Sequence, residues 1–206
     1  MGCPQYKMEG LTEKHVKQLS KREAKMTRTL TEKILASASG NVSVSPGDLV
    51  VVKPHVIAFM DASTKYFPWF EKNDIRVRDP SRIIFCFDHF MRSSVRGGAV
   101  EHHPLIREFA RQQGIPRGNV YDIGRHGLQH QIPAEEGWAL PGTVYVGADS
   151  QSATMGALGC FALAATGEVH VIAALGEAWL RVPESVRVNL YGKPRPGLLG
   201  KDVFLH

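Results

Sequence analysis

Two pairs of polar residues follow apolar runs of the chain and offer groups suited to proton transfer. Asp88 and His89 follow one run, and Asp149 and Ser150 follow another. An imidazole with an ordinary pKa of about 6.5 exchanges protons at neutral pH, and a neighbouring carboxylate raises that pKa and orients the ring. Structural roles stay open: His89 as a buried histidine bonded to a backbone carbonyl, and Asp149 or Ser150 as a helix N-cap.

The other histidine motifs give weaker indications of chemistry. His126 and His130 have the i, i+4 spacing of a zinc-binding helix, but Gly127 favours a loop and no glutamate lies between the histidines. We therefore disfavour a zinc hydrolase. His102 and His103 directly precede a proline, which predicts a solvent-exposed turn.

Two further enzyme classes lack their sequence motifs. Gly97 and Gly98 are not followed by a glycine-rich dinucleotide motif or a P-loop. Ser150 is not part of a G-x-S-x-G elbow. The sequence thus favours neither a glycine-rich nucleotide loop nor a serine hydrolase.

The elements that must position these residues alternate between strands and helices. Strands are predicted at 49–52, 56–59, 82–87, 120–124, 143–146, 168–174 and 186–190. Helices are predicted at 11–38, with a restart near Thr31 and an end at Gly40, and at 104–114 and 153–165. This alternation predicts an α/β fold, a three-layer α/β/α sandwich around a mostly parallel sheet. Ligands bind outside the carboxyl ends of such strands, so we expect both polar pairs to converge there.

Composition and charge narrow the function classes. The 206 residues are 43% hydrophobic and 22% charged, which excludes wholesale disorder. Residues 1–36 carry +4 of the net +5, so a solvated basic helix explains the charge better than a nucleic-acid surface. No apolar run approaches the roughly 18 residues of a membrane span, and no secretory signal is present. We expect a cytoplasmic protein without nucleic-acid or membrane partners.

The three cysteines, Cys3, Cys86 and Cys160, are far apart in the sequence. Their spacing excludes a disulfide scaffold and favours a reducing compartment. It also makes this chain a poor holder of an iron–sulfur cluster, which needs several thiolates.

Several segments occur in the order found in the aconitase superfamily. They are Thr31–Ala36, Asp88–Phe90, Gly127–Gln131, Leu140–Gly142, Gly147–Ser150, Gly156–Gly159 and Trp179–Glu184. The sequence resembles that superfamily, and in particular the large subunits of 3-isopropylmalate dehydratase and homoaconitase, over about residues 27–206. Residues 1–26 are predicted to form a basic helical extension.

The resemblance implies one component of a hydro-lyase that removes and re-adds water on a hydroxy di- or tricarboxylic acid. It implies that Asp88 and His89 help the hydroxyl depart, with His130 and Asp149 in the same catalytic pocket. Substrate contacts are implied for Ser150, Gln151, Asp61 and Ser63. A 4Fe–4S cluster would act as Lewis acid. Its cysteine ligands are absent from this chain, so no metal ligand is predicted here and a complementary subunit or further domains would carry the cluster and the swivelling domain.

Two departures from the superfamily pattern keep other hypotheses open. Gln151 stands where the pattern has a histidine, and Met60 stands where it has histidine or glutamine. A catalytically silent scaffold or regulatory subunit is one alternative. The other is a cluster-independent enzyme that uses Asp88, His89 and His130 as acid–base groups, with or without a divalent metal.

Overall fold

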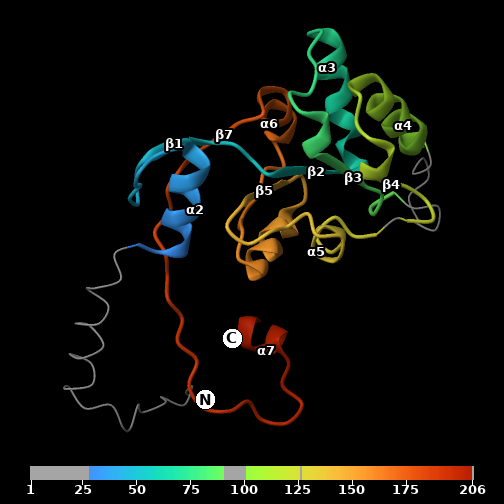
Figure 1. Cartoon of the computed structure of the whole chain (residues 1–206). Helices are drawn as coiled ribbons and strands as arrows, with labels where there is room; N and C mark the ends of the chain where they lie inside the picture. The colour runs from blue at the N-terminus through green and yellow to red at the C-terminus, as the bar shows by residue number, and fades with distance from the viewer. Residues whose placement is uncertain (1–27, 91–100, 126, 206) are drawn as a thin grey trace, which may run out of the picture.

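A five-stranded, wholly parallel sheet forms the centre of the protein. The computed structural model describes residues 28–90, 101–125 and 127–205 (Figure 1). The strand order across the sheet is β4-β3-β2-β5-β6. The strands are β2 (Val56–Met60), β3 (Ile83–Cys86), β4 (Val120–Tyr121), β5 (Val144–Gly147) and β6 (Phe161–Ala164).

The central strands are apolar along their whole length because both of their faces are covered. All residues of β3 and β5 are buried, as are the first four residues of β2. Parallel pairing sets Phe59 beside Phe85, whose rings stack at 5.0 Å, and Ile57 beside Ile83. The register therefore brings the ends of β2 and β3 to the same edge of the sheet.

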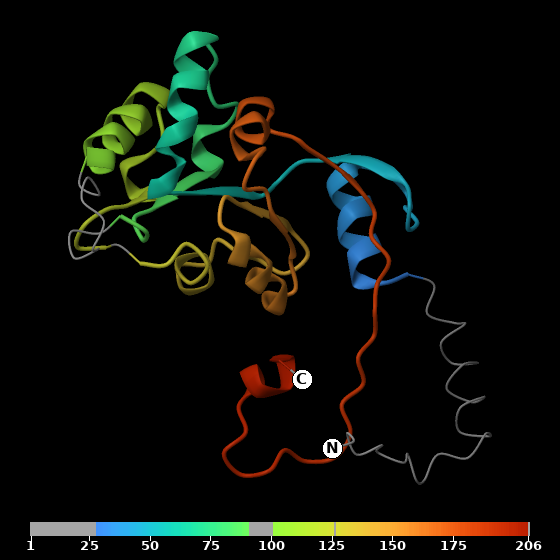
Figure 2. The ribbon, with the colours of Figure 1, turned by 180° about the vertical axis from the view of Figure 1, so that it is seen from behind.

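Helices cover both faces of this sheet, which confirms the predicted three-layer α/β/α sandwich (Figures 1 and 2). Residues of α3 (Phe67–Lys72), α4 (His102–Gln113) and α6 (Val169–Leu175) share one hydrophobic core with one face of the strands. Residues of α5 (Ile132–Glu135) and η5, a 3₁₀ helix (Ser150–Leu158), share a second core with the other face.

A two-stranded antiparallel ribbon, β1 (Leu49–Val52) with β7 (Ala178–Arg181), lies beside the sandwich with α2 (Leu30–Ser39). A capping box between Thr29 and Glu32 starts α2, and Gly40, at φ +73°, ends it. The predicted end at Gly40 is confirmed. The helix begins one residue before the predicted restart, and the predicted helical segment 11–27 lies outside the described residues.

Three predicted elements were wrong. Gly159, at φ +79°, ends η5, so 153–165 is not one helix and β6 begins at Phe161. Segment 168–174 is not a strand, because its buried residues Val169, Ile172 and Ala173 have helical spacing in α6. Segment 186–190 alternates apolar and polar residues, but it is exposed and no strand among the described residues pairs with it.

Short elements complete the described chain: the 3₁₀ helices η1 (Asp61–Tyr66), η2 (Pro80–Arg82) and η4 (Arg117–Asn119), and α7 (Gly200–Leu205). The segment 183–205 extends away from the sheet and ends in α7 (Figure 2). Among the described helices, none is long and apolar enough to span a bilayer.

Candidate active site

Three strand ends bring a histidine and three carboxylates together. Asp61 follows β2, Asp88 and His89 follow β3, and Asp149 follows β5. The His89 Nδ1 atom lies 2.6 Å from Asp88 Oδ1 and 4.0 Å from Asp61 Oδ1, and its Nε2 atom lies 3.6 Å from Asp149 Oδ2. The predicted convergence at the carboxyl ends of the strands is thus confirmed for Asp88, His89 and Asp149, and Asp61 joins them there.

Asp61 fixes the backbone that carries His89. Its carboxylate is fully buried, and both of its oxygens accept the His89 N–H at 3.0 Å. Its Oδ2 atom also accepts the Phe90 N–H at 2.6 Å. Ser63, equally buried, accepts the Met60 N–H through its Oγ atom at 3.2 Å. Both side chains therefore bond to backbone within the site.

Asp88 forms the inner wall of the site. Its Oδ2 atom accepts the Gln129 N–H at 2.8 Å, while its Oδ1 atom bonds to His89. Burial raises the pKa of this carboxyl, and the hydrogen bonds from His89 and Gln129 offset only part of that effect. Gln129 thus joins the segment after β4 to the end of β3.

The surroundings of His89 favour the protonated imidazole although the ring is partly buried. Burial opposes protonation, but the hydrogen bond to Asp88 and the negative charges of Asp88, Asp61 and Asp149 outweigh it, so the pKa of His89 is raised above 6.5. The side chain is 44% exposed, so a bound molecule can reach it. Protonation of His89 is therefore favoured, and its exposed part can offer the proton to a bound molecule.

Asp149 serves both the site and the start of η5. Its Oδ1 atom accepts the Gln151 N–H at 2.6 Å as an N-cap, and its Oδ2 atom faces His89. Ser150 and Gln151 are exposed beside it, and the Ser150 hydroxyl donates to Gln151 Oε1 at 2.8 Å. Asp149 is therefore the N-cap of η5 and also lies beside His89, so the cap prediction is confirmed and its catalytic role stays a prediction.

A buried polar layer beneath the site escaped the sequence prediction. The Gln129 side chain donates from Nε2 to Tyr145 Oη at 2.9 Å and to the Ala58 carbonyl at 3.3 Å. Gln129 Oε1 and Ser152 Oγ have no hydrogen-bond partner among the described residues. Gly147 makes this layer possible, because a Cβ atom there would overlap with Ser152 and Gln129. A glycine at the end of a buried strand was the one available signal.

The remaining histidines do not join the cluster around His89. His130 lies in a turn, and its buried Nδ1 atom has no partner among the described residues. His126 lies outside the described residues. The expected turn at His102 and His103 is wrong: both begin α4, where His103 is buried against Phe87 with 4.6 Å between ring centroids. A proline in the first turn is compatible with this helix because its missing N–H is not needed there.

Comparison with known proteins identifies the family of the chain. The model of the aconitase family (aconitate hydratase) matches residues 53–206. The chain belongs to the aconitase family. A probable methanogen homoaconitase large subunit from Methanothermobacter thermautotrophicus is 37% identical to it over 86% of this chain and 42% of its own length. The 3-isopropylmalate dehydratase large subunit of Saccharolobus solfataricus is 42% identical, with the same two shares covered, and that of Acetivibrio thermocellus is 39% identical over 88% and 43%.

This aconitase-family chain spans less than half the length of these relatives, and its described cysteines do not fit an iron–sulfur cluster. Cys86 and Cys160 are free, and both side chains are packed in the hydrophobic core beneath the sheet. Burial raises the pKa of both thiols, which disfavours the thiolates that a cluster requires. Cys3 lies outside the described residues. The described cysteines are therefore unsuited to hold a cluster.

The group of Asp61, Asp88 and His89 is also poorly suited to bind a divalent cation. Their potential ligand atoms lie within 4.8 Å of one another. Both oxygens of Asp61 already accept backbone N–H groups, and Asp88 bonds to His89 and Gln129. The arrangement instead suits a protonated imidazole, which supplies the positive charge that the three carboxylates surround.

Proposed function

We propose that the chain is a component of a hydro-lyase that acts on a hydroxy di- or tricarboxylic acid. Family membership supports this reaction class, and the names of its relatives refer to homoaconitase and 3-isopropylmalate dehydratase. The observation that carries the proposal is the position of His89 among Asp61, Asp88 and Asp149 at the carboxyl ends of the strands.

In the proposed reaction His89 is the general acid. As the substrate C–O bond breaks, the oxygen leaves with the electron pair and takes the proton from His89 Nε2, so that water departs. Nε2 is assigned this proton because Nδ1 bonds to Asp88, whereas Nε2 lies 3.6 Å from Asp149. The proton on the adjacent carbon goes to a base that we assign to a complementary subunit or further domains, and the carbon–carbon double bond forms between the two carbons.

The other predicted residues take different positions around this acid. We propose that Ser150 and Gln151, which are exposed, contact the carboxylates of the substrate, and that His130 lies at the edge of the same pocket. Asp61 and Ser63 are buried and bonded to backbone, so we propose that they position His89 and do not contact the substrate.

The proposed reaction needs cluster cysteines and a proton-abstracting base in addition to the described residues. The described cysteines do not fit the 4Fe–4S cluster that the family resemblance implies, and the chain covers 42–43% of its relatives' length. We propose that a complementary subunit or further domains supply the cluster cysteines and the proton-abstracting base.

The test combines this chain with the segments that its relatives have beyond the matched region. The residues of the Saccharolobus solfataricus large subunit beyond the matched region, together with that enzyme's small subunit, are co-purified anaerobically with this chain. Dehydration of 3-isopropylmalate and of citrate is followed by the ultraviolet absorbance of the new double bond. We expect turnover with one of the acids and a loss of about 10²-fold or more in His89→Ala, the range for removal of a general acid.

His55→Ala is the matched control, because His55 is exposed in the turn between β1 and β2, at the opposite end of β2 from the site. It should retain the activity of the unchanged chain. Equal activities of His89→Ala and the unchanged chain would overturn the assignment of His89.

Gln151 supports a second candidate, a catalytically silent family member. An amide cannot shuttle protons, and this one bonds to Ser150 at the open side of the site. Calorimetric titration with the same two acids separates the candidates: binding without turnover in the assembled complex, restored to turnover by Gln151→His, favours the silent member. Turnover by the unchanged chain excludes it.

A further inference from the structure

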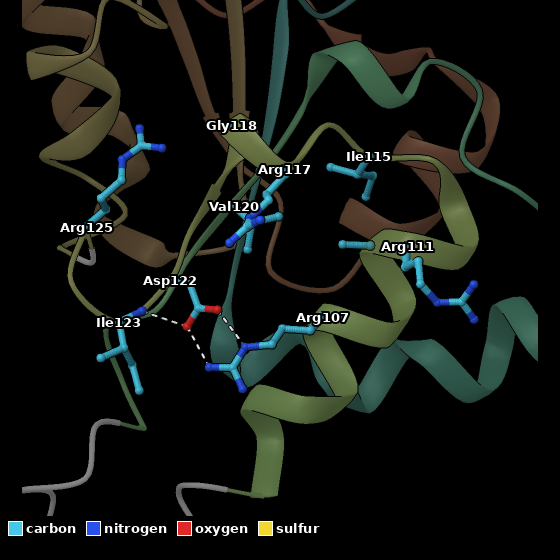
Figure 3. Close-up of a pocket in the computed structure, with 10 residues that line it drawn as sticks. Arg107, Arg111, Ile115, Arg117, Gly118, Val120, Asp122, Ile123 and Arg125 are labelled. Carbon is cyan, nitrogen blue, oxygen red and sulfur yellow. Dashed lines mark hydrogen bonds and ion pairs between the residues drawn. The ribbon is translucent and has the colours of Figure 1, made fainter.

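An arginine-rich groove lies beside β4, at the edge of the sheet (Figure 3). Its volume is about 840 Å³, within the range of pockets that bind small molecules. It is lined by residues of α4, η4, β4 and the turn after β4. Four of these residues are arginines: Arg107, Arg111, Arg117 and Arg125. None of the residues that line the groove belongs to the proposed hydro-lyase site.

Two of these arginines are neutralised by carboxylates. Arg107 forms a bidentate pair with Asp122, at 2.6 and 2.8 Å, and Figure 3 shows the two side chains facing each other. Arg111 pairs in the same way with Glu108, one turn earlier in α4, at 2.9 and 2.6 Å. These two guanidinium groups therefore have little charge left for a ligand.

The other two arginines retain their capacity to bind an anion. Arg117 is exposed and pairs with no residue in the described part of the chain. Arg125 reaches Glu136 only at 4.0 Å, and its guanidinium lies over the Tyr121 ring, 5.1 Å from the centroid. Arg117 precedes β4 in the chain and Arg125 follows it, and both line the groove (Figure 3). Guanidinium groups bind phosphate and carboxylate oxygens in bidentate geometry.

Apart from the arginines and Asp122, the groove is lined by apolar residues and Gly118. Ala110 and Ile115 form a buried base, Val120 is half-buried, and the Ile123 side chain is 57% exposed. An inorganic anion would leave this surface in contact with water. A ligand with an apolar or flat body would cover it, and a guanidinium group also stacks on flat rings.

We propose that this groove binds an anionic small molecule with a flat apolar body, of the nucleoside diphosphate class. The phosphates would pair with Arg117 and Arg125, and the base would cover Val120 and Ile123. No glycine-rich loop is needed, because the arginine side chains replace the backbone N–H groups that such a loop supplies. The groove lies beside β4, at the edge of the sheet, and Asp88 follows the neighbouring strand β3, so the proposed ligand binds near the hydro-lyase site without occupying it.

Calorimetric titration of the full chain tests this proposal with three probes: ADP, pyrophosphate and adenosine. ADP carries both features of the proposed ligand, pyrophosphate only the charge, and adenosine only the flat body. We expect ADP to bind at least tenfold more tightly than either of the others. Dissociation constants of ADP above about 1 mM, or equal affinities for ADP and pyrophosphate, would overturn the proposal.

Single substitutions locate the binding. Arg117→Ala should weaken ADP binding about tenfold, since one charge-assisted hydrogen-bonding partner is lost. Arg195→Ala removes the same charge from an exposed position in the extended segment 183–205 and should change it less than twofold. Ile123→Asp places a negative charge on the apolar surface and should abolish binding. Circular dichroism checks that each variant folds, and equal effects of Arg117→Ala and Arg195→Ala would exclude this groove as the site.

Discussion

Replacement of Asp61 should destabilise the protein by loosening the backbone that carries His89. The carboxylate is fully buried and accepts the N–H groups of His89 and Phe90. Asp61→Ala leaves both donors without this partner, and an unsatisfied buried donor costs about 1–3 kcal/mol. Both residues are partly exposed, so water satisfies part of this loss, and we expect a total loss of about 2–4 kcal/mol.

Asp61→Asn separates the hydrogen bonds from the charge. The amide keeps one acceptor oxygen but turns an NH₂ group toward the second donor, so we expect an intermediate loss of about 1–2 kcal/mol. It also removes a negative charge that favours protonated His89, so the pKa of His89 should fall.

Urea unfolding followed by circular dichroism measures both losses. Asp74→Asn is the matched control, because Asp74 is exposed and its φ of +50° is tolerated by asparagine. It should change the free energy of unfolding by less than about 0.5 kcal/mol. A loss below 1 kcal/mol in Asp61→Ala would refute the assignment of Asp61 as the support of the His89 backbone.

Three further predictions concern the site and the core. The folded-state pKa of His89 is raised, so its contribution to stability is complete below about pH 6.5 and is lost as the pH rises through the folded-state pKa. The urea midpoint of the unchanged chain should therefore fall above pH 6.5, and the midpoint of His89→Gln should lack this part of the fall. Gly147→Ala should cost about 1–3 kcal/mol in urea unfolding, because its methyl group overlaps with the buried polar layer, and an unchanged midpoint would contradict that packing. Phe109→Ala should lower the free energy of unfolding by about 3–5 kcal/mol, because the ring is buried and stacks on Phe67 at 4.0 Å; a loss under 2 kcal/mol in the same assay would contradict its place in the core.

The sequence predicts the sheet and the position of the site well because both depend on short-range signals. The runs that became β2, β3 and β5 are apolar throughout, as strands with two covered faces must be. Polar residues directly beyond such strands had to converge, since parallel strands end at one edge. That reasoning placed His89 and Asp149 together across 60 residues of chain, as the structure has them.

Errors arose where a short apolar run fits two periodicities. Val169–Leu175 is rich in β-branched and small apolar residues, so its sequence is compatible with a strand and with a helix. In the structure it is a helix that ends at Gly176, at φ +72°. The residues of β6 follow a 3₁₀ helix after only two residues, and helical propensity masked that boundary.

The support beneath the site depends on contacts that no local pattern encodes. Gln129 bonds to Tyr145, to Ala58 and, through its backbone, to Asp88, which lies 41 residues earlier. His103 is buried because α4 turns it toward Phe87, although the two residues before it in the sequence, Glu101 and His102, are polar. Such positions follow from tertiary packing, which a single sequence does not reveal.

The most direct test of the account is the titration of His89 by two-dimensional NMR of its imidazole nitrogens and protons. The account predicts a midpoint above pH 6.5 in the unchanged chain, since the three carboxylates outweigh the effect of burial. It also predicts a lower midpoint in Asp149→Asn, which removes the charge 3.6 Å from Nε2. A midpoint at or below 6.5 in the unchanged chain, or no change in Asp149→Asn, would contradict an acid assembled from these strand ends.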